Sequence, residues 1–254
     1  WGRQSTGKTV WDAAVDRCIQ VMQTYDDFYV SFSGGKDSTA VLMAALEAAK
    51  VINYPKPVRV VHFDEEVVHP ETEAYTRRVQ EQHDTDFHWY CLPVRQHNAC
   101  SSSDPIWWPW APEVEHLWVR DMPEWSVTAH DCPWFPYKEP EQRPSVLSCG
   151  PYVFADWDAE APGKKRCAII LGIRAAESMM RRKAIAAKRE SDDHWITHKT
   201  GHLSWVSLCY PVFDWTDADV WAAPKKFGWD YNRFYNELNM LGLPLSNQRV
   251  GTPF

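Results

Sequence analysis

The sequence lacks three features that would place it in a specialised class of proteins. No apolar run approaches the ~18 residues that a transmembrane helix needs, so we expect no membrane-spanning segment. It opens at Trp1, with no charged and then apolar leader, so we expect no secretory route. It has no excess of basic residues, because its formal net charge is −7. That charge argues against a protein that holds nucleic acid mainly through phosphate electrostatics.

Paired cysteines are also missing. The seven cysteines are odd in number and include no Cys-x-x-Cys motif. This pattern fits neither a secreted disulfide framework nor a zinc or iron–sulfur site, so we expect a reducing cytoplasm. They are Cys18, Cys91, Cys100, Cys132, Cys149, Cys167 and Cys209.

What is present is the composition of an ordinary globular protein. The 254 residues are 44% hydrophobic and 24% charged. A chain of this length can bury one good-sized core, and we interpret residues 1–254 as one domain. The 15 tryptophans are unusual, and they crowd the middle of the chain.

The first third of the chain alternates amphipathic helical patterns with short apolar strands. The predicted elements are helix 10–25, strand 28–32, helix 37–50, strand 58–63, helix 70–84 and strand 87–92. Near-continuous apolar strands are typical of parallel sheets covered on both sides. The sequence therefore predicts a doubly wound α/β fold, with a mainly parallel sheet and helices on both faces.

The regular pattern stops at residues 93–163, which are rich in proline and tryptophan. A structureless loop of that length is improbable in a compact domain, so we interpret it as an inserted lobe packed by its own aromatics. Regularity returns with a strand at 167–171 and a helix at about 175–188. A hairpin pairing 194–197 with 203–208 and helices at 217–227 and 231–241 complete the prediction.

The clearest motif is the run Ser33-Gly34-Gly35-Lys36-Asp37-Ser38. A buried strand ends in two glycines, and a helix begins directly after them. Free N–H groups and the positive end of the helix then face one spot, which predicts a phosphate site. Serine hydroxyls and Lys36 would add further donors.

A second run, Gly172-x-Arg174-x-x-Glu177-Ser178-x-x-Arg181, follows the strand at 167–171. Arg174, Ser178 and Arg181 are expected on one helical face, at surface positions suited to a diphosphate or sulfate group. The alternative for an isolated Arg/Glu pair on a helix is a surface ion pair.

Together the two runs resemble the N-type ATP pyrophosphatases, whose PP-loop the first run matches, and in particular the phosphoadenosine phosphosulfate (PAPS) reductase-like family. The resemblance implies an adenine-nucleotide alpha hydrolase-like fold that binds ATP, or PAPS or APS. It implies cleavage between the α- and β-phosphates, with adenylyl transfer to an acceptor. Lys36, Asp37 and Arg174 would be catalytic, with Asp37 as a Mg²⁺ ligand. Nucleotide-binding residues would be Ser33, Gly34, Gly35, Lys36, Asp37, Ser38, Asp64, Gly172, Arg174, Glu177, Ser178 and Arg181.

Two further stretches resemble the same family. Residues 62–72 look like its second strand and Pro-Glu-Thr helix start, which places Asp64 near the adenosine; residues 210–221 look like its Pro-x-x-x-Trp segment. In these motifs the chain also resembles the phage and plasmid IbrA-like proteins. That similarity implies an alternative function, a nucleotide-sensing component that acts with a ParB-like partner.

Sulfonucleotide reduction is a third function, and the cysteines oppose it. PAPS reductases use a nucleophilic Cys in a Gly-Cys segment near the C-terminus, whereas Cys209, the last cysteine here, falls in a predicted strand. Cys149-Gly150 is the only Cys-Gly pair and lies elsewhere. Both are expected to be buried, unreactive thiols.

Four other patterns have competing interpretations. Gly2 to Thr9 satisfies the Walker A pattern, but no strand precedes it, which favours a polar lead-in to the first helix. The insert tryptophans either form its core or stack nucleic-acid bases. His116, His130, Cys100, Cys132 and Cys149 have no known metal-ligand spacing. A basic cluster is either a solvated helix face or a polyanion site: Lys164, Lys165, Arg166, Arg174, Arg181, Arg182, Lys183, Lys188 and Arg189.

Overall fold

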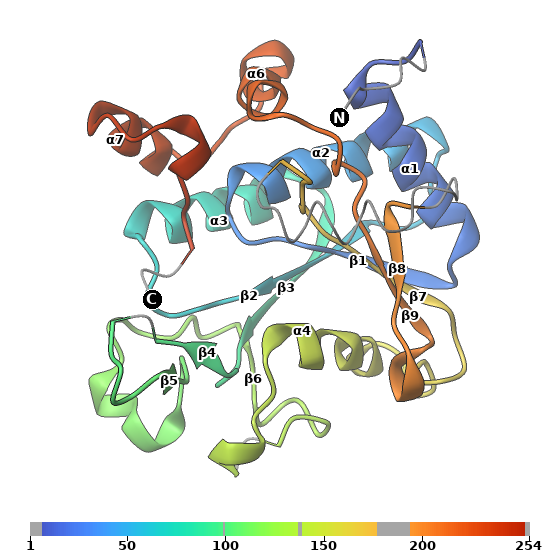
Figure 1. The fold of residues 1–254 in the computed structure, drawn as a ribbon. Coiled ribbons are helices and arrows are strands. Elements are labelled where there is room, and N and C mark those ends of the chain that lie inside the picture. Colours follow the sequence, from blue (N-terminus) through green and yellow to red (C-terminus); the bar gives the residue numbers. More distant parts are fainter. Residues whose placement is uncertain (1–6, 99, 137–138, 177–193, 252–254) are drawn as a thin grey trace.

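A computed structural model describes residues 7–98, 100–136, 139–176 and 194–251. Helices and strands alternate through the first part of the chain, and the strands run side by side through the centre of the molecule (Figure 1). The N-terminal elements are α1 (Val10–Thr24), β1 (Asp27–Ser31), α2 (Lys36–Val51), β2 (Val58–Phe63), α3 (Pro70–Gln82) and β3 (Thr85–Cys91). The later strands are β4 (Gln96–His97), β5 (Ile106–Trp107), β6 (Val127–Thr128), β7 (Cys167–Ile170), β8 (Ile196–His198) and β9 (Val206–Cys209). The later helices are α4 (Val146–Cys149), α6 (Asp217–Phe227) and α7 (Phe234–Met240). The 3₁₀ turns are η1 (Pro112–Leu117), η2 (Pro140–Gln142), η3 (Gly150–Asp156), η4 (Gly201–Leu203) and η5 (Leu245–Asn247).

The main sheet has seven strands in the order β6-β3-β2-β1-β7-β9-β8. All neighbours pair in parallel except β8, which runs antiparallel to β9. The predicted doubly wound, mainly parallel α/β fold is therefore confirmed. The predicted hairpin is present as β8 and β9, with its first strand slightly later in the chain than expected.

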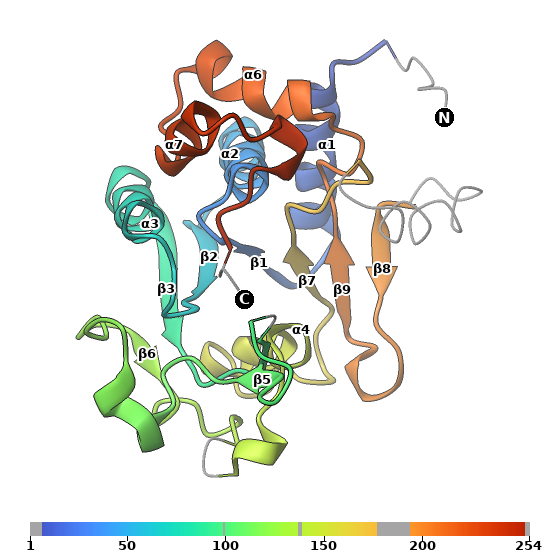
Figure 2. The ribbon, with the colours of Figure 1, turned by 60° about the vertical axis from the view of Figure 1, so that its left-hand side comes forward.

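One face of the sheet is covered by α1, α2 and α3, and α6 packs on α2. Phe28, Val30 and Val60 point to this face and pack with apolar residues of these helices, including the fully buried Val41 and Ala44 of α2. Alternation of side chains along the strands sends their neighbours to the opposite face. Figure 2 shows α1, α2 and α6 on one side of the sheet and α4 on the other.

The opposite face is covered by α4 and η3, which belong to the tryptophan-rich segment. Tyr29 and Ile169 of the sheet pack here with Val153 and Phe154 of η3. The Tyr29 hydroxyl donates to the Gly150 carbonyl at 3.1 Å, and a Cβ on Gly150 would lie 2.9 Å from that hydroxyl. This part of the predicted lobe therefore forms a layer of the fold against the sheet.

The rest of the tryptophan-rich segment joins the edge of the sheet. β6 pairs in parallel with β3, and Trp110 is 1% exposed in a small cluster with Trp89 and Cys91. Trp125, in contrast, is 48% exposed. The core interpretation thus holds for Trp110.

Two predicted helices have different outcomes at the C-terminal side. The predicted helix at 175–188 falls almost wholly outside the described residues. The helix predicted at 231–241 is shorter, spanning Phe234–Met240, and the Asn232 side chain accepts the Phe234 N–H just before it. Among the described residues, none of the helices has the length and apolar character that crossing a bilayer requires.

Candidate functional site

Two loops meet where the strand order of the sheet reverses. β1 and β7 are parallel neighbours, with Val30 opposite Ile170. The chain leaves β1 towards β2 on one side, and β7 lies on the other side. Residues 33–38 follow β1 and residues 172–174 follow β7, so both leave the carboxyl edge of the sheet. This edge is where ligands bind in open α/β sheets.

The first loop turns sharply at Gly34, whose φ of 72° favours glycine. A Cβ there would lie 2.9 Å from Thr76 Oγ1 and 3.0 Å from Thr72 Cγ2, both on α3. The Asn232 side chain donates to the Gly34 carbonyl at 3.0 Å and to Thr72 Oγ1 at 2.9 Å. The turn is therefore clamped between α3 and the segment before α7.

The start of α2 faces the same edge. Its N-cap is Gly35, which has no side chain to cap the helix, and 16 residues of aligned peptide dipoles follow. Ser38 braces the loop, because its hydroxyl donates to the Gly35 carbonyl at 2.9 Å and accepts the Ser33 N–H at 3.2 Å. Ser33 itself is exposed at the loop. The predicted succession of a strand, two glycines and a helix start is thus present.

Gly172 places the second loop directly against the first. A Cβ on Gly172 would lie 2.5 Å from the Asp37 carbonyl oxygen and 2.7 Å from the Ser38 nitrogen. These are backbone atoms in the first turn of α2, so they cannot move aside without shifting the helix. Contact between the two loops therefore requires glycine at this position.

We expect Gly172→Ala to lower the free energy of unfolding by about 2 kcal/mol, as overpacking against rigid backbone typically does. It should also weaken binding of inorganic pyrophosphate, because it displaces the first turn of α2. Denaturant unfolding and calorimetric titration measure the two effects. Gly251→Ala is the matched control, because a Cβ there meets nothing within 4 Å. Equal stability of the two variants would contradict the contact.

Lys36 is buried, with 9% exposure, and the C-terminal segment covers it. Its Nζ donates to the Gln248 carbonyl at 3.1 Å and lies 3.3 Å from Asp37 Oδ2. It also lies 5.6 Å from the centre of the Tyr235 ring, and the Tyr235 hydroxyl accepts the Lys36 N–H at 3.0 Å. A phosphate that reaches Lys36 therefore binds beside the Gln248 carbonyl or takes its place, because an ammonium has three N–H donors.

Arg174 is 1% exposed, which corrects the expectation that it lies at the surface. Its Nε donates to Asp37 Oδ1 at 2.5 Å and its second amino group to Asp217 Oδ1 at 2.8 Å. Burial alone would lower the pKa of the guanidinium, but the two carboxylates raise it above its ordinary value. Arg174 therefore ties the two loops and the start of α6 together.

Asp37 does not fit the role of a Mg²⁺ ligand in this arrangement. One carboxylate oxygen faces Arg174 and the other faces Lys36. A divalent cation there would compete with two fixed positive charges. Asp37 therefore acts as the common counter-ion of the two cations.

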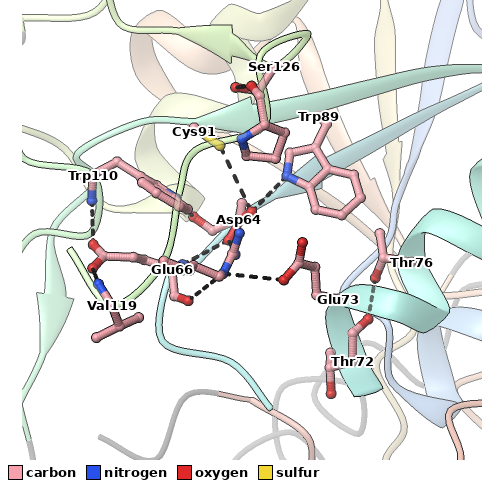
Figure 3. Close-up of polar contacts among 12 residues, drawn as sticks. Asp64, Glu66, Thr72, Glu73, Thr76, Trp89, Cys91, Trp110, Val119 and Ser126 are labelled. Atoms are coloured by element: carbon pink, nitrogen blue, oxygen red, sulfur yellow. Dashed lines mark hydrogen bonds and ion pairs between the residues drawn. The ribbon is translucent and has the colours of Figure 1, made fainter. Parts of the chain in front are cut away.

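Asp64 lies at the end of β2 in a separate polar cluster, shown in Figure 3. Its side chain is fully buried and accepts Trp89 Nε1 at 2.7 Å and the Arg120 guanidinium at 2.5 Å. Burial alone would raise the pKa of Asp64, but His62 and Arg120 together hold it below its ordinary value. Because these partners occupy it, Asp64 anchors the tryptophan-rich segment, and its predicted contact with adenosine has no support in this geometry.

Glu66 completes the anchor. Its φ is 60°, and its carboxylate accepts the backbone N–H groups of Trp110 at 2.8 Å and Val119 at 3.0 Å (Figure 3). Arg120 reaches back to the Glu66 carbonyl at 3.0 Å and to Glu73 of α3 at 3.6 Å. Sequence patterns gave no signal for Arg120, because nothing in its neighbours marks it as an anchor.

The remaining predicted residues are only partly described. Glu177, Ser178 and Arg181 lie outside the described residues, as does most of the basic cluster. Of its described members, Lys164 pairs with Glu160 and Lys165 with Asp158. Lys8 of the Walker A-like run is exposed and pairs with Asp16, and Thr9 caps α1. Those two residues therefore behave as a polar lead-in to α1.

Six of the seven cysteines are buried thiols, and Cys100 is exposed. Burial raises the pKa of Cys149 and of Cys167 to about 12, and it raises the pKa values of Cys18, Cys91 and Cys132. Cys209 is fully buried. Within the described ranges, no three His, Cys, Asp or Glu side chains are grouped to hold a metal ion.

Two cavities border the paired loops. One, of about 400 Å³, is lined by Arg174 and Asp217 together with Arg249 and its neighbours in the C-terminal segment. The other, of about 540 Å³, is lined by Lys36 and by residues of α6 and α7. Each cavity therefore reaches one of the two buried cations. Sequence reasoning did not single out the C-terminal segment, because it carries no motif.

The chain is similar in sequence to one protein family and to one curated protein. Residues 27–104 match the phosphoadenosine phosphosulfate reductase domain family. The chain is 33% identical over 96% of its length to the uncharacterized protein YbdN of Escherichia coli K12, and it spans 59% of that protein.

Two solved structures share the fold. A phosphoadenylyl-sulfate reductase from Candida auris, solved as a phosphate complex, has a TM-score of 0.53 at 14% identity, covering 94% of this chain and 88% of that one. An FMN adenylyltransferase from Candida glabrata, in complex with FMN and the ATP analogue AMPCPP, has a TM-score of 0.50 at 11% identity. The match covers 92% of this chain and 64% of that one. At these identities the likeness concerns the fold alone.

Proposed function

We propose, on the basis of the match of residues 27–104, that the chain is a PAPS reductase-like protein that binds an adenine nucleotide and cleaves it between the α- and β-phosphates. The supporting observation is the direct contact of the two loops at the switch point, where Gly172 packs on the first turn of α2. The phosphates would lie at the start of α2, where N–H groups and the helix dipole favour anions.

The proposed reaction is adenylyl transfer. An acceptor oxygen attacks the α-phosphorus, the bond to the bridging oxygen breaks, and pyrophosphate leaves with the electron pair. Lys36 and the start of α2 would neutralise the charge that develops on the leaving pyrophosphate. Lys36 would do so by exchanging the Gln248 carbonyl for a phosphate oxygen, which replaces a neutral acceptor by a charged and stronger one.

Arg174 has a different part in this proposal. Because both its carboxylate partners hold it in place, it positions Asp37 and, through Asp37, Lys36. It also lines the 400 Å³ cavity, beside which a phosphate oxygen would find a fixed positive charge. Release of pyrophosphate from ATP or of sulfite from PAPS distinguishes the two nucleotides.

Release of pyrophosphate from ATP tests the proposed reaction, and the cysteines separate it from sulfonucleotide reduction. A reductase needs a nucleophilic thiol, and losing that thiol abolishes turnover. Since Cys149 and Cys209 are buried, we expect Cys149→Ala and Cys209→Ala each to keep pyrophosphate release within about tenfold of the wild type. Wild type and variants should release no sulfite from PAPS in the presence of thioredoxin. If the wild type released sulfite and one of these substitutions abolished that release, the protein would be a sulfonucleotide reductase instead.

A second candidate is nucleotide sensing without turnover, through a protein partner such as the ParB-like one implied by the IbrA-like resemblance. The observation that favours it is the contact of the C-terminal segment with Lys36: a bound phosphate that took the place of the Gln248 carbonyl would move this segment. Nucleotide binding that changes protease cleavage of this segment, with no pyrophosphate release, would favour sensing over turnover. The IbrA-like sub-family itself stays a prediction.

A further inference from the structure

The larger cavity lies between α2, α6 and α7, on the side of α2 away from the sheet. Figures 1 and 2 both show α6 and α7 above the start of α2. The cavity measures about 540 Å³ and reaches Lys36, Thr39 and Ala40 of α2. Its volume falls within the range of small-molecule sites.

Two lining residues carry buried polar atoms without a hydrogen-bond partner in the described part of the chain. One is the Trp221 Nε1–H donor and the other is the Gln248 Oε1 acceptor. Gln248 is 1% exposed, and its side-chain nitrogen already donates to the Leu243 carbonyl at 2.8 Å. An unpaired buried polar group costs about 1–3 kcal/mol, so a ligand that reached these two atoms from the cavity would be stabilised by pairing with them.

The other lining groups restrict the ligand further. Trp221, Trp229, Tyr231 and Tyr235 supply aromatic surface, and the Trp221 and Tyr235 rings meet edge to face at 4.9 Å. Among the described residues, the charged ones that line the cavity are Lys36 and Lys225, and none of the lining residues is a carboxylate. Aromatic walls favour a planar ring, and the lysines favour an attached anion.

We infer that this cavity binds a planar heteroaromatic ring that bears a hydrogen-bond acceptor and a donor and is joined to an anionic group beside Lys36. The inference rests on the proposed function, because that anion is the phosphate assigned to the PP-loop. The ring has two sources with the same chemistry. It is either the base of the bound nucleotide or the ring of the molecule that receives the adenylyl group.

Calorimetric titration with three probes tests the inference. AMP represents the nucleotide base, FMN represents a separate ring with a phosphate, and inorganic pyrophosphate reports on the PP-loop alone. Trp221→Phe keeps the ring and removes the N–H donor. We expect it to weaken binding of AMP or of FMN by about tenfold or more, and to leave pyrophosphate binding within about twofold.

Two further variants guard against a loss of folding. Trp157→Phe is the matched control, because Trp157 also has a buried indole N–H without a described partner but does not line the cavity. It should leave all three dissociation constants within about twofold. Asn239→Trp fills the cavity from an exposed position on α7, so it should weaken ring binding without unfolding the protein.

The outcomes separate the two proposals. A loss confined to AMP identifies the ring as the nucleotide base, and a loss confined to FMN identifies a separate molecule. The inference is overturned if neither ring probe binds the wild type, or if Trp221→Phe and Asn239→Trp bind both as the wild type does. Failure of pyrophosphate to bind the wild type overturns the proposed function instead, and the ring probes still decide the cavity.

Discussion

Replacing Lys36 with alanine is expected to weaken binding of a non-hydrolysable ATP analogue by more than about tenfold. The Nζ of Lys36 lies in a site from which water is largely excluded, at 5.6 Å from the centre of the Tyr235 ring. Hydrogen bonds to charged partners contribute about 1.5–3 kcal/mol, and 1.4 kcal/mol corresponds to tenfold in affinity. Because few waters can take the place of the lost ammonium, we expect the affinity to fall by at least about tenfold. Calorimetric titration gives the two dissociation constants directly.

Lys8→Ala is the control for this experiment. Lys8 belongs to the Walker A-like run, and its side chain is 58% exposed in an ion pair with Asp16, so its removal should change affinity less than about twofold. Lys36→Met separates charge from packing, because it keeps an unbranched apolar stem and should lose as much affinity as Lys36→Ala. A loss in Lys8→Ala that equals or exceeds the loss in Lys36→Ala would replace the PP-loop by the Walker A run as the phosphate site.

The fold was predictable because its signals are local. Buried parallel strands such as β1 and β2 form short apolar runs, and the helices between them carry one apolar face. The two glycine-containing loops were also predictable, because each follows a strand and each matches a motif that can be read directly from the sequence. What these patterns do not encode is the pairing of distant side chains.

The role of Arg174 shows this limit. Its place after β7 predicts that it lies near the phosphates, but only the tertiary structure brings Asp37 and Asp217 to it. A window of neighbouring residues holds neither partner, so sequence reasoning placed Arg174 at the surface. Arg120 was missed for the same reason, because its partners Asp64 and Glu73 lie far away in the sequence.

The tryptophan-rich segment shows a second limit of sequence patterns. Proline and tryptophan mark irregular backbone, and irregular backbone carries no periodicity from which a buried face could be inferred. The segment nevertheless covers one face of the sheet through Val153 and Phe154. Its irregularity is compatible with that role because short turns such as η3 bring their backbone close to Tyr29.

Arg174→Gln is expected to lower the free energy of unfolding by about 2 to 3 kcal/mol. Removing one partner of a buried ion pair typically costs about 3–5 kcal/mol, because the other charge stays buried and unpaired. Here the cost is moderated, since Lys36 still faces Asp37 at 3.3 Å and the Asp217 side chain is 35% exposed. For a chain of this size the loss corresponds to a fall in Tm of roughly 4 to 12 °C.

The matched control for this prediction is Arg77→Gln. Arg77 also pairs with a carboxylate, that of Glu73 at 2.7 Å, but its side chain is 40% exposed on α3. Loss of an exposed pair is worth under about 1 kcal/mol, so the Tm of this variant should stay within a few degrees of the wild type. Equal midpoints for the two variants in thermal unfolding would show that the ion pairs of Arg174 do not stabilise the fold. If the folded Arg174→Gln variant bound pyrophosphate as the wild type does, Arg174 would not belong to the binding site. Neither its charge nor its contact with Asp37 would then contribute to phosphate binding.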